Sequence, residues 1–127
     1  MARVMICDDD RAGAEALLRA LRAAGHEAER CGHTMDVLRA AARGDFELIA
    51  VGLDMPGFGR NGAVEALSEI APDTALIAFH DRPSEIMRAR AHAHPRLAAV
   101  LPRPIRVPDF MYAVVCALKE PAMADPV

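Results

Sequence analysis

Lysine is nearly absent from this sequence, and long apolar runs are absent altogether. Of the 15 basic residues one is a lysine, Lys119, and the other 14 are arginines. Because Lys119 lies just before the C-terminal tail, a mechanism that needs a lysine in a central pocket is excluded. No uncharged run approaches the roughly 18–20 apolar residues of a bilayer-spanning helix, and Met1–Cys7 does not resemble a signal peptide. We therefore expect no membrane partner and a cytoplasmic location.

Cysteine and excess charge are also scarce. The three cysteines are Cys7, Cys31 and Cys116, an odd number without the spacing of a metal motif, so reduced thiols are expected. A formal net charge of −3 gives no reason to expect nucleic acid as a partner. With 53% hydrophobic and 26% charged residues over 127 positions, the composition is that of one globular domain.

Short apolar runs alternate with amphipathic segments. The runs are nearly continuous in apolar character, which is typical of strands buried on both faces of a parallel sheet. We predict four such strands and a more polar edge strand, over Val4–Cys7, Leu48–Val51, Ala75–Phe79, Ala98–Leu101 and Glu27–Cys31. We predict helices over Arg11–Ala24, Asp36–Ala42, Ala63–Ile70, Ser84–Ala93 and Pro108–Lys119. This alternation predicts an α/β doubly wound sheet, with one domain over 1–120 and a short tail over 121–127.

Several residues carry signals for helix ends. We expect Asp10 to cap the first helix, Gly25 to end it and Thr34 to cap the second. Pro108 suits the first turn of the last helix.

Residues that follow the strands carry the chemistry, because ligands of such sheets bind at the carboxyl ends of the strands. Asp8 and Asp9 follow the first strand and are expected to share an acidic pocket that needs a neutralising cation. The third strand is followed by Gly52-Leu53-Asp54-Met55-Pro56-Gly57, and the fourth by His80-Asp81. The last is followed by Pro102-Arg103-Pro104.

The order and spacing of these motifs resemble the receiver domain of bacterial response regulators over residues 3 to 119. The resemblance implies a flavodoxin-like parallel sheet of strand order 2-1-3-4-5 with helices on both faces. In that family the acidic pair, here Asp8 and Asp9, binds Mg²⁺. The residue four before the Met-Pro-Gly proline is an Asp that accepts phosphate from a histidine kinase, and here it is Gly52.

Other family positions are substituted as well. The Thr or Ser that ends the fourth strand is replaced by His80, the Lys before Pro104 by Arg103, and the aromatic switch residue by Val100. Glycine cannot form an acyl phosphate, so we expect a degenerate receiver. Asp54 is the candidate substitute acceptor, and weak Mg²⁺ binding by Asp8, Asp9 and Asp54 is the most that we expect of metal.

Arg103 leaves two interpretations open: it bridges to Asp8 or Asp9, or it points to solvent. If it bridges, we expect the pKa of the paired Asp to be depressed. His80 near the acids weakly suggests a transition-metal site, and a hydrogen-bonded His is the more common case. His92 and His94 are expected to be solvated. The Gly57–Gly62 loop is about two residues longer than the family pattern and is interpreted as a surface insertion or as a flap over the pocket.

The sequence thus predicts a protein-interaction module of a two-component or phosphorelay pathway, with no catalytic residues. Its expected partners are a histidine kinase or another regulator, or a second copy bound through the apolar residues of the last helix. Two alternatives stay open: a regulator phosphorylated at Asp54, and a small flavodoxin-like cofactor protein. Three acids after the first strand disfavour the cofactor protein, because they repel an anionic ligand.

Overall fold

Five parallel strands form the centre of the molecule. The computed structural model describes residues 1–59, 62–81 and 94–119. The strand order is β2-β1-β3-β4-β5, which confirms the predicted topology. The strands are β1 (Arg3–Cys7), β2 (Glu27–Cys31), β3 (Leu48–Gly52), β4 (Ala75–His80) and β5 (Leu97–Pro102).

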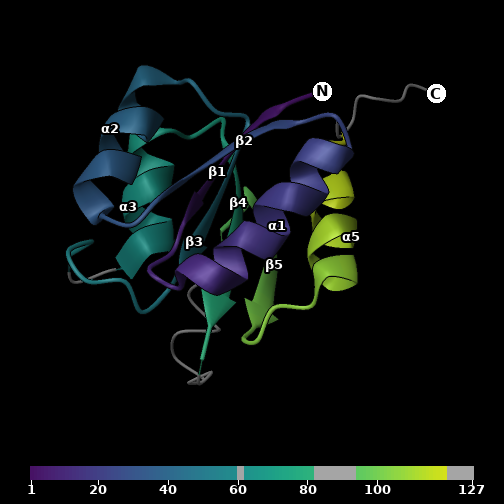
Figure 1. Cartoon of the computed structure of the whole chain (residues 1–127). Coiled ribbons are helices and arrows are strands. Elements are labelled where there is room, and N and C mark those ends of the chain that lie inside the picture. Colours follow the sequence, from purple (N-terminus) through teal and green to yellow (C-terminus); the bar gives the residue numbers. More distant parts are fainter. Residues whose placement is uncertain (60–61, 82–93, 120–127) are drawn as a thin grey trace.

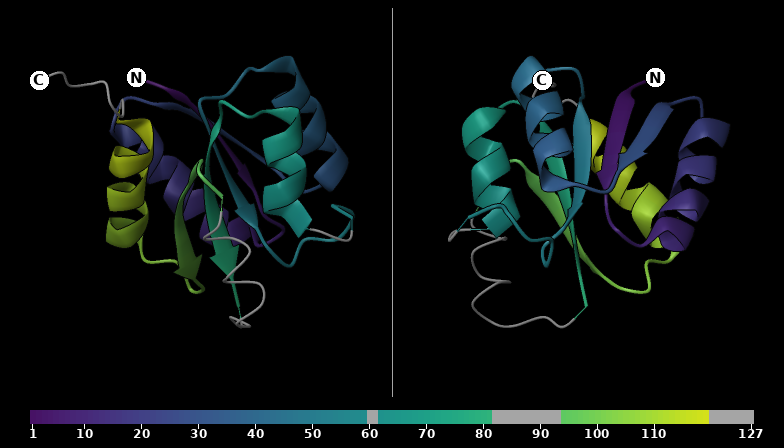
Figure 2. Two further views of the ribbon diagram at one scale, coloured as in Figure 1. Left: turned by 180° about the vertical axis from the view of Figure 1, so that it is seen from behind. Right: turned by 60° about the vertical axis from the view of Figure 1, so that its left-hand side comes forward.

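The described helices cover the sheet in two layers. They are α1 (Arg11–Ala23), α2 (Thr34–Arg43), α3 (Gly62–Ile70) and α5 (Val107–Leu118). Figure 1 shows α1 and α5 on one face and α2 and α3 on the other, and both views of Figure 2 keep the same layers. These bounds agree with the predicted elements to within two residues. The predicted helix over Ser84–Ala93 and the tail over 121–127 lie outside the described residues.

The observed helix ends agree with those predicted from the sequence, with one exception. Asp10 caps α1 by accepting a hydrogen bond from the Gly13 N–H at 3.2 Å, and Gly25 follows with a φ of 95°. Pro108 lies in the first turn of α5. The prediction that Thr34 caps α2 is wrong: its hydroxyl instead donates to the carbonyl of Pro56. A tertiary bond to the loop after β3 has replaced the local cap.

Each face of the sheet has its own apolar core. The first, under α2 and α3, includes Met5, Cys7, Ile49 and Val51. The second, under α1 and α5, is centred on Phe79 and Phe110, whose ring centroids lie 6.0 Å apart. Both rings are fully buried. The strands β3 and β4 are buried along their whole length, as their nearly continuous apolar sequences predict.

The loop after β3 is only in part a surface loop. Phe58, predicted to lie in a surface insertion or flap, is 8% exposed and packs into the core under α2 and α3. The prediction of a surface insertion is therefore wrong for Phe58, whereas residues 60 and 61 lie outside the described part. Within the described residues, no helix is both long and apolar enough to cross a bilayer.

Candidate functional site

Arg103 lies at the carboxyl edge of the sheet and contacts acids from three other strand ends. Its Nη2 donates to Oδ1 of Asp8 at 2.9 Å. Its Nη1 lies 3.1 Å from Oδ1 of Asp54 and 3.3 Å from Oδ1 of Asp81. The Arg103 side chain is 13% exposed, so the structure favours the bridging interpretation over a solvent-facing arginine. One guanidinium thus connects the ends of β1, β3, β4 and β5.

Asp8 is the buried member of this cluster. Its side chain is 5% exposed, and its Oδ1 also accepts the backbone N–H of Asp10 at 3.2 Å. Burial raises the pKa of Asp8, and the Asp10 N–H and the Arg103 guanidinium reduce that shift without cancelling it. The expected depression of the pKa is therefore wrong for Asp8. Loss of hydration outweighs the ion pair.

Arg103 is held charged within the cluster. Burial alone would lower the pKa of Arg103, but hydrogen bonds and charge attraction from Asp8 and Asp54 raise it overall. The guanidinium carbon also lies 6.0 Å from the centroid of the Phe79 ring, at the outer limit of a cation–π contact. The arginine therefore acts as a fixed cation over the end of the sheet.

Gly52 makes room for this cation. A β-carbon at position 52 would lie 2.5 Å from Nη2 of Arg103 and 3.1 Å from Oδ1 of Asp54. Its backbone φ is outside the left-handed region, so conformational freedom is not the reason for glycine here. Space is the reason: the guanidinium occupies the volume where a side chain at this position would begin.

The acids present do not fit a receiver-type Mg²⁺ site. Asp8 is buried against the guanidinium, whereas Asp9 is exposed, so the two do not share a buried pocket. Gly52 supplies no carboxylate, and the guanidinium beside it already pairs with Asp8 at 2.9 Å. Across residues 1–59, 62–81 and 94–119, no group of three or more His, Cys, Asp or Glu side chains could hold a metal ion. The transition-metal site considered for His80 gains no support from this.

Of the other family positions, His80 and Pro104 lie at this edge, whereas Val100 lies within β5. His80 ends β4 and is buried, and its carbonyl accepts the Arg103 N–H at 2.8 Å. Val100 pairs with Ala78 within the sheet and is half-buried. Pro104 follows Arg103 through a cis peptide bond and is exposed.

Asp81 is a member of the cluster to which sequence analysis gave no role. It follows β4 directly, so its place at the strand end was a signal that could have found it. His94 was predicted to be solvated, but it is half-buried and its Nδ1 lies 3.1 Å from the Ser68 hydroxyl. His92 lies outside the described residues.

Two curated relatives are similar in sequence. A response regulator receiver protein from Anaeromyxobacter sp. (strain Fw109-5) is 32% identical over 113 residues, which are 87% of this chain and 46% of the relative. The DNA-binding transcriptional regulator NtrC of Azospirillum brasilense is 28% identical over 117 residues, 92% of this chain and 24% of the relative. The chain thus spans less than half the length of either relative. No protein-family model matches it.

A solved structure shares the fold. The response regulator receiver domain protein (CheY-like) from Methanospirillum hungatei JF-1 superposes with a TM-score of 0.78 at 18% identity, and 91% of each chain is covered. The two chains share one fold, which in this chain is a parallel sheet of strand order β2-β1-β3-β4-β5. The chain is therefore similar in sequence to response regulators, and it has the fold of a receiver domain.

Proposed function

We propose that this chain is a receiver domain that is held in one state instead of being switched by phosphate. In this proposal it serves two-component or phosphorelay signalling as a protein-interaction module, without catalysis of its own. The observation that carries the proposal is the position of the Arg103 guanidinium, bound to Asp8 at 2.9 Å and filling the space beside Gly52.

In this proposal Arg103 does permanently what the metal ion and the lysine do in a switching receiver, which is to neutralise the acids. A guanidinium stays charged at every physiological pH and its planar fork can bind two acids at once. Here it joins Asp8 on one nitrogen to Asp54 and Asp81 on the other. Four strand ends are therefore fixed relative to one another without any ligand.

The same arrangement opposes phosphorylation at the substitute acceptor. Gly52 has no carboxylate to form an acyl phosphate. The Asp54 carboxylate is 52% exposed, but its Oδ1 lies 3.1 Å from Nη1 of Arg103. A phosphoryl group transferred to Asp54 would have to displace this ion pair, and the cluster has no lysine to receive it.

The last helix supplies the surface that we propose for partners. Tyr112 is 73% exposed and Val115 is 58% exposed, and Cys116 beside them is also exposed. Phe110 and Val114, by contrast, are buried in the core, so only part of the apolar stripe predicted from the sequence is available. We propose another signalling protein as the occupant, a histidine kinase or a regulator, with a second copy of this chain as the alternative.

Phosphorylation is tested with acetyl phosphate and Mg²⁺ on the whole chain, followed by intact-mass analysis. We expect no acid-labile phosphate adduct. An adduct on the wild-type chain that is lost in Asp54→Ala would overturn the proposal in favour of a regulator that uses Asp54. An adduct that persists in Asp54→Ala would also overturn it.

The partner surface is tested separately. Sedimentation of the wild-type chain and of a Tyr112→Ser, Val115→Ser variant distinguishes a second copy from another protein. A dimer that the double substitution disrupts assigns the surface to self-association. A dimer that is unaffected contradicts the assignment of this face.

A further inference from the structure

Two cysteines face each other across the β1–β2 pair. Cys7 and Cys31 are register partners at the ends of these parallel strands. Both side chains lie on the face under α2 and α3, where Cys7 belongs to the apolar core and Cys31 packs against it. Neighbouring strands lie about 4.8 Å apart, which is within the range of Cα separations that a disulfide spans. As β2 is an edge strand, it can adjust without disturbing a second neighbour.

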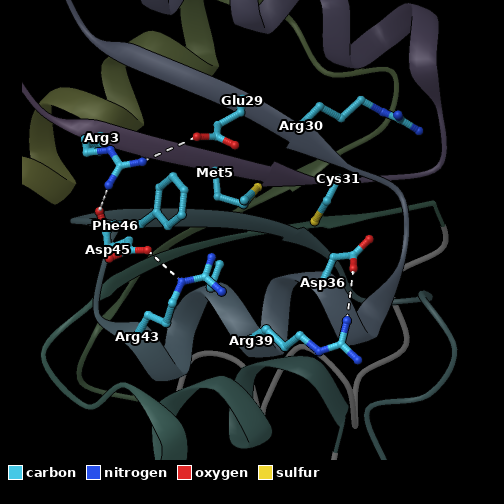
Figure 3. A pocket seen from close by; sticks show the side chains of 11 residues that line it. Arg3, Met5, Glu29, Arg30, Cys31, Asp36, Arg39, Arg43, Asp45 and Phe46 are labelled. Atoms are coloured by element: carbon cyan, nitrogen blue, oxygen red, sulfur yellow. Dashed lines mark hydrogen bonds and ion pairs between the residues drawn. The ribbon is translucent and has the colours of Figure 1, made fainter.

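The two thiols differ in their access to solvent. Cys7 is fully buried, whereas Cys31 is half-buried. Cys31 helps to line a cavity of about 410 Å³ between β2 and α2, together with Met5, Phe46 and Asp36. Figure 3 shows its sulfur directed from β2 toward α2, beside Met5. A small reagent that enters this cavity therefore reaches Cys31 and not Cys7.

The hydrogen bond within the pair favours a thiolate on the accessible member, Cys31. A hydrogen bond from Cys7 lowers the pKa of Cys31. Burial and Asp36 oppose this shift, and the His33 backbone and Arg30 support it. The same hydrogen bond and its own burial raise the pKa of Cys7. The Cys7 Sγ also lies 4.0 Å from the carbonyl of His33.

We propose that Cys31 and Cys7 form a peroxide-reactive dithiol, with Cys31 as the attacking thiol and Cys7 as the resolving one. The Cys31 thiolate attacks one oxygen of hydrogen peroxide, the O–O bond breaks, and a sulfenic acid forms with release of hydroxide, which takes up a proton to give water. The Cys7 sulfur then attacks the sulfenic sulfur, the S–O bond breaks, and the hydroxyl leaves as a second water after taking the Cys7 proton. Two thiols are oxidised to one disulfide and one peroxide is reduced to two waters.

The disulfide would form directly beside the Arg103 cluster. Cys7 precedes Asp8, whose N–H donates to the carbonyl of Cys31 at 3.1 Å. The Asp8 carbonyl in turn accepts Nε of Arg30 at 3.0 Å. Oxidation would therefore join β1 to β2 at the residue before the buried acid, in a chain that lacks the usual phosphorylation switch at Gly52.

Peptide mapping of the whole chain after treatment with hydrogen peroxide tests the proposal, with Cys116→Ser as the background that removes the exposed third thiol. Trypsin places the three cysteines in separate peptides, Val4–Arg11, Cys31–Arg39 and Val107–Lys119. We expect Val4–Arg11 and Cys31–Arg39 to be recovered as one linked peptide, with loss of both alkylatable thiols and their return after dithiothreitol. The same linked peptide is expected from the wild-type chain.

Single substitutions in that background assign the order of the two steps. Cys7→Ser should leave a sulfenic acid on Cys31 that dimedone traps, whereas Cys31→Ser should leave Cys7 free to alkylation after unfolding. Free thiols after peroxide, overoxidation of Cys31 without a linked peptide, or dimedone capture at Cys7 would overturn the proposal. A mixture of isotopically heavy and light chains checks that the link is intramolecular, and hybrid-mass links would also overturn it. The wild-type map keeps the test valid if a variant does not fold.

Discussion

The guanidinium of Arg103 occupies the space that a side chain on Gly52 would need, since a β-carbon at position 52 would lie 2.5 Å from Nη2 of Arg103. The two substitutions are therefore physically linked. Any side chain at position 52 requires the guanidinium to move, and the guanidinium is held by Asp8, Asp54 and Asp81. The effect of a substitution at one position on stability should therefore depend on the residue at the other.

A double-mutant cycle measures this link. We expect Gly52→Ala to cost about 1–2 kcal/mol, because the added methyl group displaces a guanidinium that has three partners. In the Arg103→Ala background the nearest contact is gone, and the Asp54 carboxylate, whose Oδ1 lies 3.1 Å from the added carbon, has lost its arginine partner and can shift. The same substitution should then cost less than about 0.5 kcal/mol. Urea denaturation of the four proteins gives the coupling free energy. Equal costs of Gly52→Ala in both backgrounds would show that the two groups do not compete for space.

Magnesium should bind better once Arg103 is removed. In the wild-type chain the guanidinium already neutralises Asp8, and Gly52 supplies no ligand, so we expect weak Mg²⁺ binding at most. Arg103→Ala leaves Asp8, Asp54 and Asp81 without their cation. Millimolar Mg²⁺ should therefore raise the melting temperature of this variant more than that of the wild type. A larger shift in the wild type would contradict the view that Arg103 replaces the metal.

The edge of the sheet that holds the site could be predicted from the sequence, because parallel strands place their carboxyl ends together. Asp8, Gly52, His80 and Arg103 were all assigned to that edge from the residues that follow each apolar run. The direction of the Arg103 side chain could not be predicted, because local sequence does not decide whether a long side chain after a strand folds inward or extends into water.

The errors have one physical origin, since each depends on a tertiary contact. The pKa of Asp8 was expected to fall because only its ion pair was considered, but burial to 5% exposure raises it. Thr34 was predicted to cap α2, but the fold places the carbonyl of Pro56 next to its hydroxyl. Phe58 looked like part of a surface loop, and nothing nearby in the sequence shows that the core under α2 and α3 accepts it.

Substitutions in the last helix should distinguish core residues from partner-facing residues by their effect on the free energy of unfolding. Phe110→Ala is expected to cost about 3–5 kcal/mol, because Phe110 is fully buried and packs on Phe79. Val115→Ala should change the free energy of unfolding by less than about 0.5 kcal/mol, because that side chain is 58% exposed. Thermal and urea unfolding of both variants measure the difference. Strong destabilisation by Val115→Ala would show that this face belongs to the fold and is not free for a partner.

The contribution of Arg103 to stability should depend on pH. Burial raises the folded-state pKa of Asp8 above its ordinary value of 3.8, and Arg103 limits that rise. A raised pKa means that the folded state binds the proton more tightly than the unfolded state, so ionisation of Asp8 costs stability as pH rises through the folded pKa. Arg103→Ala removes the partner and raises the pKa of Asp8 further. The variant should therefore lose about 2 kcal/mol at pH 7, where Asp8 would have to be ionised without its cation or take up a proton. The difference in the free energy of unfolding between wild type and Arg103→Ala should narrow toward pH 3, because a protonated Asp8 does not need a cation beside it.

Arg106→Ala is the matched control. That arginine is 78% exposed and lies 4.0 Å from Asp109, so its loss should cost less than about 0.5 kcal/mol at either pH. Urea denaturation of the three proteins at both pH values measures these differences. A gap between wild type and Arg103→Ala that stays constant between pH 7 and pH 3 would show that Arg103 stabilises the fold by packing and not by neutralising Asp8.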